Sequence, residues 1–409
     1  KLNAATSFLQ PEIISIGAEK LEKWLESTPD LRTYAFMIRD LIRMQEHVLD
    51  PAREQLLAEL GDASRAPNDC YDMFTNVDME FPSVKKSDGS EGQLTNGNFC
   101  VYRESGDRAI REDAFEKFFG TYKKYINTFA ATYGGSVKYD CFNAKVRGYS
   151  SACEAALSGG NVPVSVYDSL VKAIHDALPS MRRYLDIRRK AMGTDKIDMF
   201  DLYVPIVKEA DIPMPYADAK TLVKEALKPF GKRYGELLDR AYSEHWIDVY
   251  ENKGKSSGAF SAGVYGVHPY VMLNYTDTLD DAFTLAHELG HAMHSFFSSE
   301  TQDYVNHGYR IMVAEVASTV NEVMLTKFLL AHESDPGRRA YILNHFLEGF
   351  RTTVFRQTLF AEFERRAHEM YEGGTPLTAK ALSDTYYDLI STYYEGAEIN
   401  RSEERRVGK

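Results

Sequence analysis

Apolar residues recur at helical spacing along most of the 409-residue chain, which predicts a mostly α-helical protein. Residues 34–60 carry this pattern, and Pro51 stands where a second helix can begin within them. Residues 111–133 carry it too, and Gly134 and Gly135 predict the C-terminal end of that helix. Its aromatic side chains share one side and are expected to face a hydrophobic core: Phe115, Phe118, Phe119, Tyr122 and Tyr125.

Two segments depart from the helical pattern. Residues 81–98 are rich in Ser, Gly, Asp, Lys and Asn, which predicts an irregular or hairpin-like excursion. Residues 246–250 and 259–275 have strand-like apolar residues on either side of a polar, Gly-rich turn, which predicts a small sheet. We place a domain boundary in the first segment, so that residues 1–95 form an N-terminal helical part and residues 96–400 form the main body.

The predicted sheet is followed directly by a helix with metal-binding chemistry. Residues 284–295 read TLAHELGHAMHS, and positions four apart lie on one face of a helix. His287 and His291 can therefore offer two imidazole nitrogens to one ion. Glu288 can reach a water molecule at that ion without binding the metal, as a general base must. Asp280 and Asp281 stand where they can cap the helix and oppose its dipole.

A catalytic zinc ion needs a third protein ligand and one open position. The longer pattern HExxHxxGxxH is excluded, because His294 stands in place of its glycine and Phe297 in place of its third histidine. The remaining candidates downstream are Glu300, Asp303, His307, Glu315 and Glu322.

Glu315 is the strongest of these candidates. It lies in a predicted helix, residues 310–331, on which Glu315 and Glu322 form an acidic stripe beside small and apolar residues. Burying such a stripe is costly unless it meets a cation, and zinc with two imidazole ligands is such a cation. We therefore interpret Glu315 as the third zinc ligand. Glu322, one heptad later, is expected to accept a hydrogen bond from a ligand imidazole; the alternative is an ordinary glutamate on the helix surface.

The segment before the metal helix suggests how a peptide could be held. Residues 267–275, VHPYVMLNY, read as a strand, and Pro269 is tolerated only at an edge or at a strand start. An edge strand can pair with an extended peptide. We therefore predict that this strand is an edge of the sheet and pairs with substrate, although no individual substrate-binding residue is identified.

Charge and cysteine usage exclude several other classes of protein. The net charge is −12 and no basic stretch is interleaved with aromatic residues, which argues against nucleic-acid binding. No apolar run is long enough to span a bilayer and no signal peptide is recognisable at the N-terminus. The cysteines are few and form no CxxC pair, as expected of free thiols in a cytoplasmic protein: Cys70, Cys100, Cys141 and Cys153.

The motifs together resemble a known family. The stretch GAFSAGVYGVHPYVMLNYTDTLDDAFTLAHELGHAMHS, followed by VAEVASTVNE, is similar to the oligoendopeptidase F branch of the thimet-oligopeptidase-like zinc metallopeptidases. DMFDLYVPIV at residues 198–207 and FRQTLFAEFE at residues 355–364 are similar to the same branch. The resemblance runs from about residue 20 to residue 400. It implies a mostly helical body around a deep channel with zinc at its floor, His287, His291 and Glu315 as ligands, and Glu288 as base.

Both ends of the chain depart from this family pattern. Relatives begin earlier, and they continue beyond the position of residue 400 into a helical stretch whose tyrosine and histidine side chains stabilise the oxyanion. Here residues 401–409 read RSEERRVGK, which we interpret as a non-native tail. The chain is therefore expected to be truncated at both ends, with an incomplete catalytic body, and to bind zinc while turning over peptide slowly or not at all.

The function predicted from the sequence is a zinc metalloendopeptidase that hydrolyses short, unstructured oligopeptides. One zinc ion per chain activates water, and Glu288 is the general base. A carboxypeptidase or dipeptidase on the same scaffold is an alternative, as is a zinc-binding fragment without turnover. Oligopeptide substrates are the expected partners; neither nucleic acid nor a membrane is expected.

Overall fold

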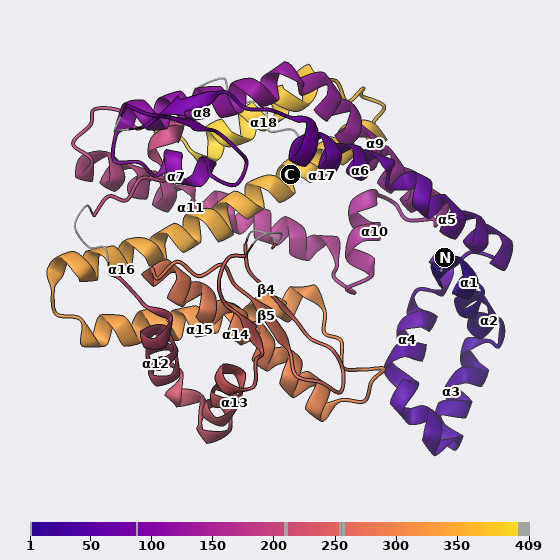
Figure 1. The fold of residues 1–409 in the computed structure, drawn as a ribbon. Coiled ribbons are helices and arrows are strands. Elements are labelled where there is room, and N and C mark those ends of the chain that lie inside the picture. Colours follow the sequence, from indigo (N-terminus) through magenta and orange to yellow (C-terminus); the bar gives the residue numbers. More distant parts are fainter. Residues whose placement is uncertain (1, 87–88, 208–211, 253–254, 256–257, 400–409) are drawn as a thin grey trace. The chain divides into compact units, whose positions relative to one another are not determined.

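The computed structural model describes residues 2–86, 89–207, 212–252, 255 and 258–399, and the predicted non-native tail therefore lies outside the described residues. Helices dominate and the sheets have only two and three strands, which confirms the mostly α-helical prediction (Figure 1). The described residues form two compact units: unit 1 comprises those within 1–16, 44–206 and 349–409, and unit 2 those within 17–43 and 207–348. The division predicted from composition, residues 1–95 and 96–400, is not tested by this grouping and stays a prediction.

Unit 1 is built on a core rich in aromatic side chains. Phe118 lies between two parallel rings, with its ring centre 4.9 Å from that of Phe81 and 4.0 Å from that of Phe99. Phe115 and Phe119 are buried beside it, as predicted, whereas Tyr125 is 39% exposed. The helices and strands of unit 1 are α1 Leu2–Thr6, α2 Leu9–Ser15, α5 Pro51–Ser64, α6 Ala66–Met73, β1 Ser83–Lys85, β2 Glu91–Gln93, α7 Phe99–Arg103, α8 Arg108–Lys124, α9 Ile126–Val146, α10 Ala152–Ser158, α11 Val164–Ala191, α17 Arg356–Glu372 and α18 Ala379–Tyr393.

Three local predictions concern unit 1, and one of them is wrong. Pro51 is the first residue of α5, and β1 pairs with β2 as an antiparallel hairpin within residues 81–98, both as predicted. Gly134 and Gly135 do not end a helix, because α9 continues through them to Val146. They permit close packing instead: a Cβ built on Gly135 would lie 2.9 Å from the Cγ atom of Pro67 on α6. Gly135 therefore marks a contact between α9 and α6, and the glycine pair does not end a helix.

Unit 2 contains the predicted metal-binding segments and has a separate apolar core. Two long helices, α14 and α15, run side by side through it, and the strands β4 and β5 lie next to α14 (Figure 1). The helices and strands of unit 2 are α3 Ala18–Ser27, α4 Ala35–Arg43, α12 Tyr216–Ala226, α13 Lys232–Ser243, β3 Ile247–Asp248, β4 Phe260–Ala262, β5 Tyr270–Met272, α14 Leu279–Thr301, α15 Ile311–His332 and α16 Pro336–Gly349.

The sheet of unit 2 corrects the prediction for residues 267–275. The strand order is β3-β5-β4, so β5, which lies within that segment, is the central strand. It pairs in parallel with β3 and antiparallel with β4. Pro269 is compatible with this position because it precedes the first residue of β5. Within the described residues β4, not β5, is the edge strand that adjoins α14.

None of the helices in the part of the chain that the structure describes is long and apolar enough to cross a lipid bilayer. The cytoplasmic location suggested by the sequence stays a prediction.

Candidate metal centre

The candidate metal centre begins with the helix α14, whose start is fixed by a capping box. The Thr278 hydroxyl accepts a hydrogen bond from the backbone N–H of Asp281, and the Asp281 carboxylate accepts one from the backbone N–H of Thr278. The apolar face of α14 is buried completely, with Leu285 and Leu289 0% exposed. Burial of this face directs the HExxH side chains towards α15 and the surface.

Three of the predicted site residues meet across α14 and α15. The Oε2 atom of Glu315 lies 3.4 Å from the Nε2 atom of His287 and 3.4 Å from the Nε2 atom of His291. Among the described residues this is the one group of three histidine, cysteine or acidic side chains close enough to share an ion. Ligand atoms about 2.1 Å from a zinc ion in tetrahedral geometry are about 3.4 Å apart, so the spacing suits zinc.

The charges around these ligands also suit a cation. Glu288, Glu315 and Glu322 place three carboxyl groups close together, and within the described residues no lysine or arginine forms an ion pair with them. Burial raises the pKa of the Glu288 carboxyl above its ordinary value, His287 acts in the opposite direction, and the two other carboxylates raise it further. A divalent ion would compensate this concentration of negative charge.

Glu288 projects from α14 beside the two histidines but does not join the ligand group. Glu288 as a whole is 6% exposed, and its Oε2 atom is buried without a hydrogen-bond partner. A buried carboxylate oxygen without a partner is costly, and such groups are characteristic of sites that bind water or substrate. This position agrees with the predicted role of a base that acts on water and not on the metal.

Two polar contacts orient the ligand side chains. The hydroxyl of Ser318 donates a hydrogen bond to Glu315 Oε2 at 2.7 Å. The Nδ1 atom of His287 lies 2.5 Å from Glu322 Oε1, which leaves Nε2 directed at the ligand group. The predicted partnership of Glu322 with a ligand imidazole is thus present as a contact, and its importance for metal binding stays a prediction.

The two helices touch at Gly290, between the two histidines. A Cβ atom built on Gly290 would lie 2.6 Å from the carbonyl oxygen of Ala317 and 2.6 Å from the Cα atom of Ser318. Real Cβ atoms do not approach backbone atoms this closely. Glycine at this position therefore allows the backbones of α14 and α15 to come into contact and brings Glu315 within reach of the imidazoles.

Three of the other candidates for third ligand lie elsewhere, while Glu322 contacts Nδ1 of His287 and not the ligand group. The Asp303 carboxylate accepts a hydrogen bond from the Thr33 hydroxyl at 2.5 Å. His307 directs Nδ1 at the backbone carbonyl of Tyr304. Glu300 pairs with Arg233 at 2.6 Å. The structure therefore brings Glu315, and none of these three, to His287 and His291.

Sequence reasoning missed two residues that join the helices of unit 2. Asn321 is 1% exposed, and its Nδ2 atom donates a hydrogen bond to the carbonyl oxygen of Ala286 at 2.9 Å. Tyr234 on α13 donates its hydroxyl to Asn321 Oδ1 at 3.0 Å. The signal in the sequence was an asparagine at the helical spacing of the buried residues of α15, which are Ala314, Ser318, Asn321, Leu325 and Thr326.

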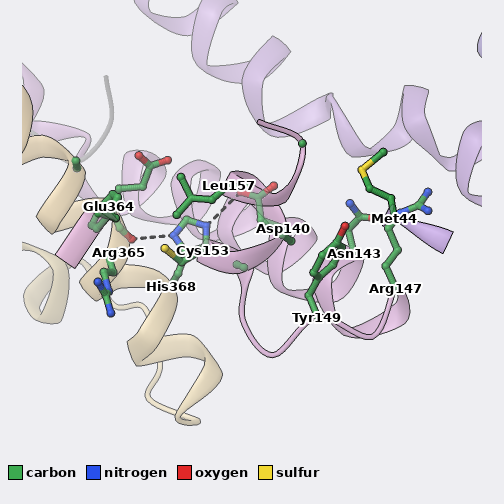
Figure 2. Close-up of a pocket in the computed structure, with 16 residues that line it drawn as sticks. Met44, Asp140, Asn143, Arg147, Tyr149, Cys153, Leu157, Glu364, Arg365 and His368 are labelled. Carbon is green, nitrogen blue, oxygen red and sulfur yellow. Dashed lines mark hydrogen bonds and ion pairs between the residues drawn. The ribbon is translucent and has the colours of Figure 1, made fainter. Parts of the chain in front are cut away.

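Unit 1 contains a separate cavity of about 430 Å³, between α9, α10 and α17. Figure 2 shows His368 held on both sides, with Nε2 3.2 Å from Asp140 Oδ2 and Nδ1 2.8 Å from the backbone oxygen of Glu364. Burial raises the pKa of the Cys153 thiol, which also lines the cavity. Because His368 has no ring nitrogen left to accept a proton from that thiol, the cavity does not form a cysteine–histidine catalytic pair.

Comparison with known proteins agrees with the motifs. Residues 101–406 match the family model described as Peptidase family M3, and residues 12–81 match that of Oligopeptidase F. The chain is 44% identical over 399 residues to the oligopeptidase PepF of Bacillus subtilis, covering 97% of this chain and 60% of that protein. It is 40% identical to the plasmid oligoendopeptidase F of Lactococcus lactis subsp. cremoris, covering 96% and 65%.

The fold agrees with a solved relative. The structure of oligoendopeptidase-F from Enterococcus faecium matches with a TM-score of 0.78 at 36% identity, over 99% of this chain and 67% of that chain. The present chain spans less than two thirds of the length of the Bacillus and Lactococcus relatives described above. From these matches, the chain belongs to peptidase family M3, in its oligoendopeptidase F branch.

Proposed function

We propose that this chain carries the metal centre of a zinc endopeptidase that hydrolyses short, unstructured peptides. The observation that carries the proposal is the position of one carboxylate oxygen, Glu315 Oε2, at 3.4 Å from both imidazole Nε2 atoms. Two histidines and one glutamate are the ligands of a catalytic zinc site that keeps a position open for water or substrate. His287, His291 and Glu315 would hold one zinc ion per chain. Membership of a peptidase family supports peptides as the substrate class.

In the proposed mechanism the zinc ion would act on the carbonyl and on water, and side chains of this chain move the proton and orient the ligands. Zinc held by His287, His291 and Glu315 would polarise the scissile carbonyl and lower the pKa of water at the open position. Glu288 accepts the proton of the attacking water and returns it to the leaving amine. Its carboxylate is suited to this task because it is buried beside the ligands and its Oε2 atom has no other partner. Glu322 holds Nδ1 of His287, so that Nε2 remains available to the ion.

The edge strand β4 is proposed to hold the peptide. Within the described residues β4 has a strand partner on one side only, namely β5. Gly263, directly after β4, lies against α14: a Cβ built on it would be 2.7 Å from the Cβ atom of Ser295, one turn beyond His291. An extended peptide that adds to an edge strand gains backbone hydrogen bonds along its length, whatever its side chains. Such pairing favours unstructured peptides.

Zinc content and cleavage measured on the same preparation test this proposal. One zinc ion per chain is expected, and cleavage of a quenched peptide, however slow, should be internal, which mass spectra of the products would show. Release of single residues or dipeptides from a chain end would instead support the carboxypeptidase or dipeptidase alternative. A folded protein without zinc would contradict the proposal.

Replacing Glu315 by alanine is expected to release the zinc, because only two imidazoles then remain as protein ligands. Asp303→Ala provides the matched control, since Asp303 is an earlier candidate ligand that contacts Thr33 instead. Metal content after dialysis, measured for both folded variants, checks the assignment. If Asp303→Ala loses zinc and Glu315→Ala keeps it, the assignment of the third ligand is wrong.

A further inference from the structure

We infer that Asn321 is a positioning residue for the proposed metal centre: it fixes the register of α15 against α14 and so places Glu315 beside the two imidazoles. This inference rests on the proposed function. Asn321 is 1% exposed and lies on the side of α15 that faces α14. Its Nδ2 atom donates a hydrogen bond at 2.9 Å to the carbonyl oxygen of Ala286, the residue directly before His287.

The acceptor of this hydrogen bond is unusual, because it lies inside a helix. In an α-helix the carbonyl of Ala286 already accepts the backbone N–H of Gly290, four residues later. A carbonyl oxygen has a second lone pair, and Asn321 uses it. Sequence neighbours on both helices belong to the apolar core of unit 2, since Leu285 and Leu289 on α14 and Leu325 on α15 are all 0% exposed. A buried amide in such surroundings is costly without well-aligned partners, so the side chain has one stable position.

The hydrogen bond from Asn321 adds a directional contact to the apolar packing between α14 and α15. The contact of Gly290 with Ala317 and Ser318 limits how closely α14 and α15 approach. Apolar packing is non-directional and tolerates sliding or rotation of one helix against the other. A slide by one residue displaces α15 by about 1.5 Å, which is several times the roughly 0.2 Å by which a metal–ligand distance can vary. The bond from Asn321 to Ala286 opposes this slide, because its donor and acceptor belong to different helices.

Asn321 lies between the two residues that orient the metal ligands. Ser318, three residues earlier, donates to Glu315 Oε2, and Glu322, the next residue, lies 2.5 Å from His287 Nδ1. Ser318 and Glu315 both belong to α15 and move together with it, whereas the contact of Glu322 with His287 crosses to α14 and depends on the register of α15. A shift of α15 would therefore disturb the Glu315 carboxylate and the His287 imidazole together, and we assign Asn321 an effect on both.

Tyr234, on α13, is the second hydrogen-bond partner of the Asn321 side chain. Its hydroxyl donates to Asn321 Oδ1 at 3.0 Å, and burial raises the pKa of Tyr234 to about 12. The phenol therefore remains protonated and can act as a donor at neutral pH. With Oδ1 accepting from Tyr234, the amide must direct its N–H₂ group at the Ala286 carbonyl. Tyr234 thus determines the orientation of the amide that joins α15 to α14.

Zinc affinity of the full 409-residue chain tests the inference, with Asn321→Leu and Tyr234→Phe as variants. Leucine has the branching and the number of side-chain heavy atoms of asparagine but lacks the amide, and phenylalanine lacks only the tyrosine oxygen. The dissociation constant for zinc, measured by competition with a chromogenic chelator, is expected to rise about 10–100-fold for Asn321→Leu. A smaller rise is expected for Tyr234→Phe. The visible spectrum of the cobalt-substituted variants should change as well, because it reports the coordination geometry.

The control separates positioning from general stability. Ile342→Val removes one methylene from a residue of the same core that is 1% exposed, and it should leave zinc affinity and the cobalt spectrum unchanged. If Asn321→Leu lowers the melting temperature of the metal-free protein but not its zinc affinity, Asn321 is only structural and the inference is wrong. If Asn321→Leu does not fold, an unchanged zinc affinity and cobalt spectrum of Tyr234→Phe overturn it.

These results are distinguishable from failure of the proposed function. Wild-type protein that binds no zinc contradicts the proposed function, and the inference falls with it. Wild-type protein that binds zinc, with variants that bind it equally well, contradicts the role of Asn321 alone.

Discussion

Replacing Glu288 by glutamine is expected to lower kcat/KM for peptide cleavage by about 10²–10⁴-fold, the usual contribution of a general base, while zinc remains bound. Glutamine keeps the shape of the side chain but cannot accept a proton from water. Zinc should remain because the ligand group consists of His287, His291 and Glu315, and Glu288 is not part of it. Peptide cleavage and bound zinc, measured on one preparation of the variant, check both parts of this expectation.

Glu300→Gln is the matched control for this variant. Glu300 lies on the same helix, α14, but pairs with Arg233, and its side chain is 44% exposed. Exposed ion pairs of this kind contribute little to stability, so the control should resemble the wild type in cleavage and in zinc content. Loss of zinc from a folded Glu288→Gln protein would show that Glu288 is a metal ligand and would contradict its assignment as the base.

Replacing Gly290 by alanine is expected to weaken zinc binding at least about 10-fold and to lower the free energy of unfolding by about 1–3 kcal/mol. The added methyl group would lie 2.6 Å from backbone atoms of Ala317 and Ser318, which cannot move aside as a flexible side chain would. The helix α15 must shift, and Glu315 shifts with it. Denaturant unfolding of the metal-free protein and chelator competition measure the two effects separately.

Gly235→Ala tests whether any new methyl group in a helix of unit 2 has this effect. Gly235 lies within α13, and a Cβ built there meets no atom within 4 Å. Alanine in an open helical position stabilises the helix by about 0.5–1 kcal/mol relative to glycine. The control should therefore be slightly more stable than the wild type, with unchanged zinc affinity. Equal zinc affinity in Gly290→Ala and the wild type would refute the idea that the helix contact determines the position of Glu315.

The sequence predicted correctly those features that depend only on residues one helical turn apart. His287 and His291 share a helix face because they are four residues apart, and the helix α14 was evident from its own periodicity. Glu315 was inferred from the cost of an acidic stripe on an apolar helix, and its Oε2 atom does lie 3.4 Å from both imidazoles. Its role as a ligand stays a prediction, but the pattern of the chain was enough to select Glu315 among the candidates.

Predictions from the sequence were wrong where a residue contacts a segment that lies far away along the chain. Gly134 and Gly135 were interpreted as a helix end, since glycine often ends helices, yet Gly135 lies within α9 beside Pro67 of α6. Residues 267–275 were predicted to be an edge strand, yet β5 has β3 and β4 on its two sides. Local propensity describes how a segment folds but not which segment lies beside it.

The amino-acid sequence by itself determined the helical class of the protein, the HExxH helix and the acidic helix that follows it. Only the tertiary structure decided how those two helices meet: Gly290 allows backbone contact with α15, and Asn321 reaches across to the carbonyl of Ala286. The physical reason is that helical periodicity arises from neighbours three or four residues apart, whereas Asn321 and Ala286 are separated by 35 residues. Their contact exists only once the apolar faces of α14 and α15 are buried against each other, and no local pattern records that pairing.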